Sequence, residues 1–82
     1  MNNWQRVTMK EAKYLTEEAG FCHQQVDWFD EDGADEFIKK GTGLKFKYRM
    51  SMGDPVSFYI SPTINGKPVS AIDFITTVKE QA

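Results

Sequence analysis

Cys22 and His23 are the first residues whose types could do chemistry, because a thiol and an imidazole can act as nucleophile and base. Sequence neighbours in a strand point to opposite faces, so the two side chains would not meet in an extended segment. The chain has one cysteine and one histidine, too few for a zinc site of such ligands. With no convergent nucleophile, base and orienting group, we expect no catalytic residue, no metal, no cofactor and no enzymatic activity.

A run of acids between residues 27 and 36 is the second candidate. It holds six carboxylates and no basic residue, together with two aromatic side chains that could anchor a protein partner. The residues of this acidic block that we expect to bind a partner are Asp27, Trp28, Phe29, Asp30, Glu31, Asp32, Asp35 and Glu36. The alternative is a solvated loop whose acids stabilise the N-terminus of the next helix.

The acidic block also contains the Asp-x-Asp-Gly order of calcium-binding EF-hand loops. Aligning Gly33 with the required glycine places Trp28 at the first ligand position and Lys39 at the bidentate glutamate position. Neither residue is a calcium ligand, so the block is not an EF-hand. Weak cation binding by its carboxylates remains an alternative.

Basic residues follow the acidic block directly, from Lys39 to Arg49, with no acid among them. Three of these bases alternate with apolar residues and are therefore expected on one exposed face of a strand. With the tyrosine opposite Arg49 they form the basic sheet face: Lys45, Lys47, Arg49 and Tyr59. Such a face could bind phosphates or an acidic protein, or it could be an ordinary solvated surface.

Two nucleic-acid motifs are excluded. The segment 40–46 shares part of the RNA-recognition strand motif, but aromatic residues are missing at Thr42 and Leu44, and Phe46 is expected to face the core. The segment 34–40 cannot be a recognition helix, because Asp35 and Glu36 at its start would be repelled by phosphates. Nucleic-acid binding therefore depends on the basic sheet face.

Two helices flank the regions that carry these candidates. Thr8 and Glu11 form a capping box that predicts a helix from Met9 to Ala19, with Gly20 as its left-handed C-terminal residue. Ser70 is the cap of a last helix, whose apolar face is Ala71, Phe74, Ile75 and Val78.

The segment between these helices is less uniform. Residues 21–29 fit a helix and a strand equally well. A short second helix is expected from Ala34 to Lys40, because acids stand in its first turn, lysines in its last turn and Gly41 beyond it.

The clearest strand is predicted from Leu44 to Met52, followed by a turn and a second alternating segment. A three-residue turn sets apolar residues opposite one another: Met52 with Val56, Met50 with Phe58, Tyr48 with Ile60, and Leu44 with Ile64. A register shifted by one residue would set apolar positions opposite polar ones, so the pattern selects this pairing. Asn65-Gly66 is a second turn, and Pro68 limits the pairing of the short segment after it.

The expected architecture is a single α+β domain over residues 1–82. It consists of an N-terminal helix, a short second helix, an antiparallel β-meander of two to four strands, and a C-terminal helix packed on one sheet face. No apolar run approaches the ~20 residues that span a bilayer, no signal peptide is recognisable, and a single cysteine suits a reducing compartment. We therefore expect a cytoplasmic protein that does not enter membranes.

The function expected from the sequence is that of a small non-enzymatic protein-interaction module. Such a module would be an adaptor, inhibitor or regulator of a larger macromolecule, of the kind common among bacterial and phage accessory proteins. The partner is expected to be a protein. The alternatives are a nucleic-acid-binding protein that uses the basic sheet face, and a homodimer in which the two oppositely charged blocks neutralise each other.

Overall fold

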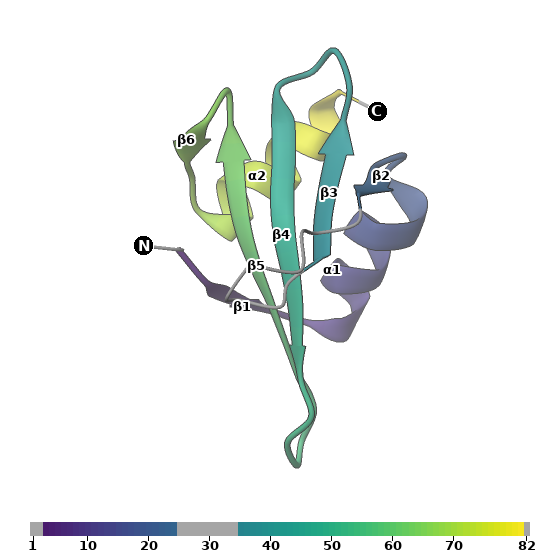
Figure 1. Ribbon diagram of the computed structural model, residues 1–82, viewed down its shortest axis with the longest axis vertical. Helices are drawn as coiled ribbons and strands as arrows, with labels where there is room; N and C mark the ends of the chain where they lie inside the picture. Colours follow the sequence, from purple (N-terminus) through teal and green to yellow (C-terminus); the bar gives the residue numbers. More distant parts are fainter. Residues whose placement is uncertain (1–2, 25–34, 82) are drawn as a thin grey trace.

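The computed structural model describes residues 3–24 and 35–81, which form an antiparallel sheet with helices on one face (Figure 1). The strands are β1 (Gln5–Val7), β2 (Cys22–Gln24), β3 (Asp35–Lys39), β4 (Leu44–Ser51), β5 (Ser57–Ile64) and β6 (Lys67–Pro68). The helical segments are α1 (Met9–Lys13), the π-helical turn η1 (Tyr14–Glu18) and α2 (Ala71–Glu80). The α+β class predicted from the sequence is confirmed.

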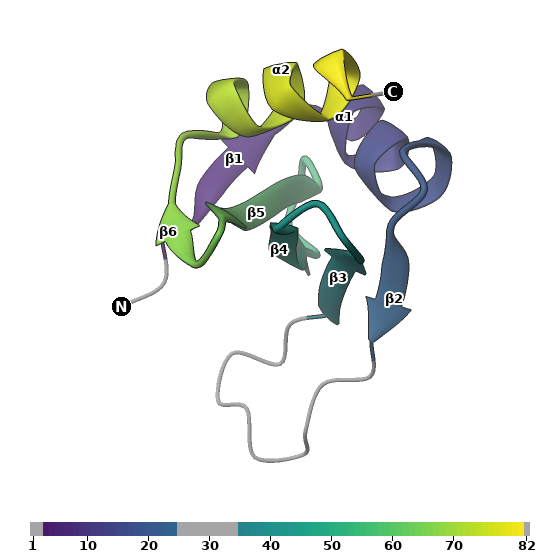
Figure 2. The same ribbon diagram turned by 90° about the horizontal axis from the view of Figure 1, so that it is seen from above.

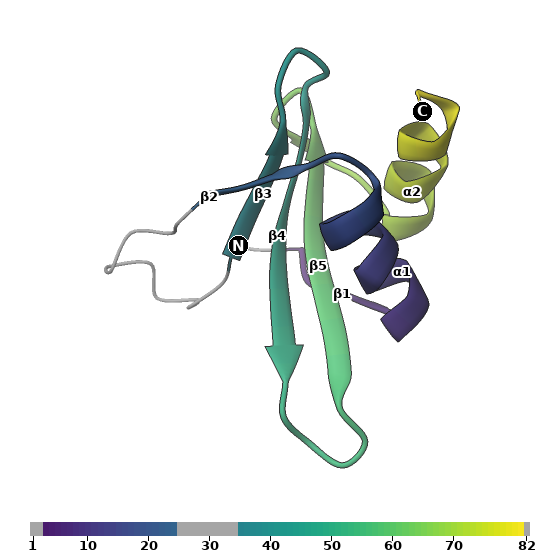
Figure 3. The ribbon, with the colours of Figure 1, turned by 90° about the vertical axis from the view of Figure 1, so that its right-hand side faces the viewer.

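The strands of the sheet lie in the order β1-β5-β4-β3-β2, with β6 also paired to β5. Strands β2 to β5 form a meander, in which each strand pairs with the next one along the chain. The first strand, β1, pairs antiparallel with β5 at the other edge of β5. Figures 2 and 3 show α1 and α2 together on one side of this sheet. No described element covers the opposite side, which is termed the open face.

The register between β4 and β5 is the one that the sequence predicts. Tyr48 lies opposite Ile60, Met50 opposite Phe58, and Leu44 opposite Ile64. Because side chains alternate along a strand, these apolar residues lie on the side of the helices and the basic residues of β4 lie on the open face.

The apolar positions nearest the β4–β5 turn are not covered as the pattern suggests. Met50, Met52 and Val56 are 47%, 79% and 40% exposed. The hairpin projects past the helices, as Figures 1 and 3 show, so no helix of the described chain packs on its tip.

The short second helix predicted from Ala34 to Lys40 is wrong, because Asp35–Lys39 is strand β3. Its five residues are too few to separate a helical period from an alternating one. Pairing with β4 sets Phe37 opposite Phe46, and that burial outweighs the charge pattern that favoured a helix. Residue 34 lies outside the described residues.

Over the described residues the sheet has six strands rather than two to four, because β1 and β3 were not expected as strands and β2 falls in the segment that fitted either alternative. Val7 directly precedes Thr8, the cap of the first helix. In the structure Val7 also ends β1 and lies opposite Phe58 of β5. Residues 22–24, which fitted both alternatives, form β2 beside β3.

The predicted capping box at the first helix is present. The backbone N–H of Glu11 donates to Oγ1 of Thr8 at 3.1 Å, and the backbone N–H of Thr8 donates to Oε1 of Glu11 at 2.9 Å. The helix then widens into a π-helical turn, in which the N–H of Ala19 donates to the carbonyl of Tyr14 at 2.9 Å. Gly20 follows with a φ of 83°, as its predicted role requires.

The core is centred on Phe46, which is fully buried. The ring of Phe37 stacks on it at 5.0 Å, and the rings of Phe21 and Phe74 meet it edge-on at 5.0 and 5.7 Å. Phe74 comes from α2, and the predicted face of that helix is buried in full. Residues from β3, β4 and α2 therefore share one aromatic cluster, which holds the helix layer against the sheet.

Two turns meet at one end of the sheet. The backbone N–H of Asn65 donates to the carbonyl of Gly43 at 2.9 Å, which joins the β5–β6 turn to the β3–β4 turn. Gly43 has a φ of 75°, and a Cβ atom there would collide with the side-chain amide of Asn65. Gly41 has a similar φ of 81°, but no atom lies within 4 Å of a Cβ at that position.

These two glycines form a matched test of the contact between the turns. Gly41→Ala should lower the free energy of unfolding by about 1 kcal/mol, the cost of a left-handed alanine. Gly43→Ala should cost about 1 kcal/mol more, because the amide of Asn65 must move. Urea unfolding measures both values. The excess should vanish in an Asn65→Gly background, and equal losses for the two alanine variants would show that the turns are not in tight contact.

Candidate functional site

The open face gathers basic side chains from three strands. Arg6 of β1 and Arg49 of β4 both lie opposite Tyr59 of β5, so these three side chains form one row across the sheet. Lys45 and Lys47 lie further along β4 on the same face. The structure therefore brings together all four predicted residues of the basic sheet face and adds Arg6 to them.

One end of the open face is a hollow of about 530 Å³ beside the two joined turns. Its lining includes the lysines Lys40, Lys45 and Lys47 and the hydroxyl residues Ser61 and Thr63. The lysine amines and the hydroxyl of Ser61 can donate hydrogen bonds to an anion, so the chemistry of these side chains suits phosphate or carboxylate oxygens.

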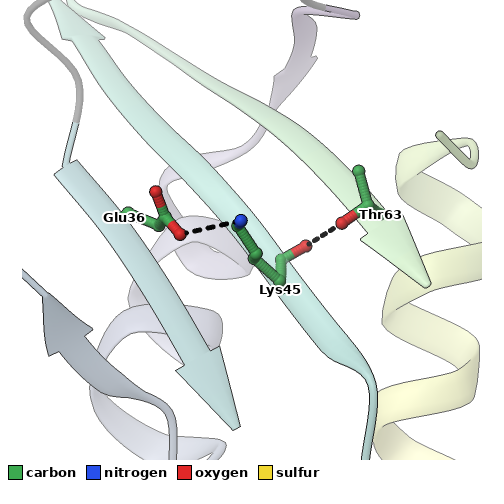
Figure 4. A network of polar contacts seen from close by, with 3 residues as sticks. All are labelled: Glu36, Lys45 and Thr63. Carbon is green, nitrogen blue, oxygen red and sulfur yellow. Dashed lines mark hydrogen bonds and ion pairs between the residues drawn. The ribbon is translucent and has the colours of Figure 1, made fainter. Parts of the chain in front are cut away.

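A carboxylate from β3 enters the same surface. Oε1 of Glu36 lies 3.0 Å from Nζ of Lys45, and Oγ1 of Thr63 donates to the carbonyl of Lys45 at 3.4 Å (Figure 4). The Lys45 side chain is 48% exposed and the Glu36 side chain 21% exposed. Glu36 was expected to belong to a separate acidic surface, but it lies on the open face and reduces the positive charge there.

The other end of the open face is aromatic. Trp4, Arg49, Ser51 and Tyr59 line a second hollow of about 280 Å³. Both aromatic residues are partly exposed. The sequence predicts Tyr59 on this face but not Trp4, because the position of Trp4 beside β5 depends on the pairing of β1 with β5. The only local signal is the alternation of Trp4 and Arg6 with Gln5 and Val7, which is too short to predict a strand.

The side chain of Gln5 fixes the position of β1. Its Oε1 accepts the backbone N–H of Ala71 at 2.6 Å, and its Nε2 donates to the carbonyl of Val69 at 2.9 Å. The backbone N–H of Asn3 donates to Oγ of Ser61 at 3.2 Å. These contacts fix the residues on both sides of Trp4, which directly precedes β1.

Most of the predicted acidic block lies outside the described residues: Asp27, Trp28, Phe29, Asp30, Glu31 and Asp32. The two described members do not share a surface. Glu36 faces the open side, whereas Asp35 lies opposite Tyr48 on the side of the helices. Oδ1 of Asp35 is 3.2 Å from Nε2 of His23.

Cys22 and His23 point to opposite sides of the sheet, as the sequence predicts for neighbours in a strand. Cys22 lies opposite Ile38, and His23 lies opposite Phe37 with its ring 5.0 Å from the phenyl ring. Over residues 3–24 and 35–81, no three histidine, cysteine or acidic side chains are grouped closely enough to hold a metal ion.

Comparison of the chain with protein families, with curated proteins and with solved structures gives no match. In the described part of the chain, neither helix has the length and apolar content needed to cross a bilayer. The candidate site therefore rests on its own geometry: a row of arginines and aromatic residues at one end of the open face, and a lysine-lined hollow at the other.

Tyr48 and Asp35 lie on the side of the sheet that the helices cover, and the ionisation of Tyr48 tests their contact. Burial raises the pKa of its phenol above the ordinary value, and the negative charge of Asp35 raises the pKa further. The fold thus favours the neutral phenol, and this stabilisation is present below the ordinary pKa and is lost as pH rises through the raised pKa.

We expect the free energy of unfolding to fall as the pH rises above about 10, the range in which an unperturbed phenol ionises. Tyr48→Phe should fall less steeply over the same range, because the variant has no proton to lose at this position. Urea unfolding at a series of pH values measures both slopes. Identical slopes would show that this phenol does not titrate differently in the folded and unfolded protein.

Proposed function

We propose that this protein is a non-enzymatic binding module that engages an acidic macromolecule through its open face, and that it acts as an adaptor, inhibitor or regulator of that partner. The observation that carries the proposal is the charge of the face. Among the described residues, four cationic side chains (Arg6, Lys45, Lys47 and Arg49) share it with the single carboxylate of Glu36.

This concentration of cations is notable because the whole chain is acidic, with a net charge of −2. Lys45, Lys47 and Arg49 are successive open-face residues of β4, so three like charges lie along one strand. The resulting local positive potential attracts anionic partners even though the net charge would repel them. This local potential supports a binding role for the open face.

The placement of the reactive side chains supports a binding role over a catalytic one. Cys22 and His23 lie on opposite sides of the sheet, and the neighbour of the imidazole is Asp35 rather than a nucleophile. The linings of both hollows on the open face include cationic side chains that can donate hydrogen bonds to a ligand, and the smaller hollow also includes two aromatic side chains.

Recognition of a protein through the acidic block stays a prediction, because residues 27–32 lie outside the described chain. The geometry supports the basic sheet face instead: its members come from paired strands, and Asp35 and Glu36 face opposite ways.

A heparin column tests whether the open face binds polyanions. The wild type should be retained at low salt despite its net negative charge. The Lys45→Glu/Arg49→Glu variant should elute at markedly lower salt, because two of the four cationic side chains described on this face are reversed in charge. Salt at elution is the measured quantity, and circular dichroism verifies that each variant is folded.

The matched control is Lys13→Glu/Lys79→Glu, which makes the same change in net charge on α1 and α2, on the other side of the sheet. This control should elute close to the wild type. Equal weakening by the two double variants would mean that net charge, and not the open face, governs retention.

A further inference from the structure

Tyr59 stands at the centre of the row that crosses the open face. Its cross-strand neighbours are Arg6 on one side and Arg49 on the other. Trp4 joins Tyr59 and Arg49 in lining the hollow at that end. Two partly exposed aromatic residues thus share this end of the open face with two exposed arginines.

Each component of this row has a counterpart in a nucleotide. Aromatic rings stack on the faces of bases, and guanidinium groups stack on bases or pair with phosphates. Along β4, Arg49 and Lys45 are four residues apart, which is about 14 Å at the rise of a strand. The open face therefore has aromatic rings for base stacking at one end and a lysine-lined hollow for backbone phosphates at the other. The two ends are separated along the direction of β4.

The aromatic end distinguishes among acidic partners. The bases of a duplex are stacked on one another and hidden from a flat surface, whereas the bases of a single strand can lie on exposed rings. An acidic protein would be attracted by the cations but has no planar bases to stack on Trp4 and Tyr59. Both hollows are small, at about 280 and 530 Å³, and neither is a groove that could receive a whole duplex.

Resting on the function proposed above, we infer that the open face binds single-stranded nucleic acid, with bases stacked on Trp4 and Tyr59 and phosphates held by Arg6, Arg49 and the lysines of β4. Glu36 opposes this binding, because its carboxylate lies 3.0 Å from Nζ of Lys45 and neutralises part of the phosphate-binding charge.

The test uses the full chain and a fluorescently labelled oligothymidylate, with fluorescence anisotropy as the measurement of affinity. Competitors are an unlabelled duplex of equal length and a polyglutamate peptide of equal charge. The oligothymidylate should bind, and both competitors should displace it only at about tenfold higher concentration or more, because neither offers free bases to stack.

Aromatic variants separate stacking from charge. Tyr59→Ala and Trp4→Ala should each weaken binding by about tenfold, the effect of losing one stacked base. Tyr59→Phe keeps the ring and should stay within about threefold of the wild type, which distinguishes stacking from a hydroxyl contact and from a loss of folding.

Charge variants test the other half of the inference. Arg49→Gln should weaken binding and reduce the slope of affinity against salt by about one, because one phosphate contact is lost. Glu36→Gln should strengthen binding by severalfold and leave the preference for a single strand unchanged. Lys13→Gln is the control of equal charge change on α1 and should alter neither quantity.

The outcomes keep the inference separate from the proposed function. If polyglutamate or duplex displaces the oligothymidylate as well as unlabelled single strand does, or if Trp4→Ala and Tyr59→Ala bind like the wild type, the inference is overturned while the open face remains a polyanion-binding surface. If the protein is also not retained on heparin, the proposed function fails with it.

Discussion

The pairing of β4 with β5 is the constraint on which the rest of this structure depends. Along β4, fully buried Phe46 alternates with Lys45 and Lys47, and the register with β5 sends the phenyl ring to the helices and the two amines to the open face. A slip of one residue would place the amines in the core, where an unpaired charge is very costly. One pairing therefore determines both the core and the surface that we propose to be functional.

Elements with a long alternating or capping pattern could be predicted from the sequence, whereas elements with a short pattern could not. The eight-residue strands β4 and β5 were predicted with their register because strict alternation over that length has one consistent pairing. Short local signals identified the N-terminal caps of both helices, Thr8 and Ser70, and Gly20 marked the end of the first helix. Asp35–Lys39 was misjudged because five residues fit either period, and its partner in β4 decides the outcome.

The candidate site was likewise half predictable. Lys45, Lys47, Arg49 and Tyr59 belong to the predicted hairpin, so their common face was known from the sequence. Trp4 and Arg6 joined them only through β1, which pairs with residues more than fifty positions away and leaves little trace in its own three residues. Glu36 was assigned to the acidic block, yet the β3–β4 hairpin turns this neighbour in sequence into a cross-strand partner of the basic residues.

The contacts of Gln5 have a consequence for how the open face assembles. They join residues 64 and 66 positions apart, and loops of that length have the largest closure entropy in so short a chain. Contacts of high sequence separation also slow folding. A chain that has formed only the β4–β5 hairpin already displays the lysines, but Arg6 of β1 and Trp4 just before β1 are not yet in place beside Tyr59. The aromatic end of the surface is thus complete only in the fully folded molecule, and a chain that has formed the hairpin alone carries the β4 charges and Tyr59 without Trp4 beside them.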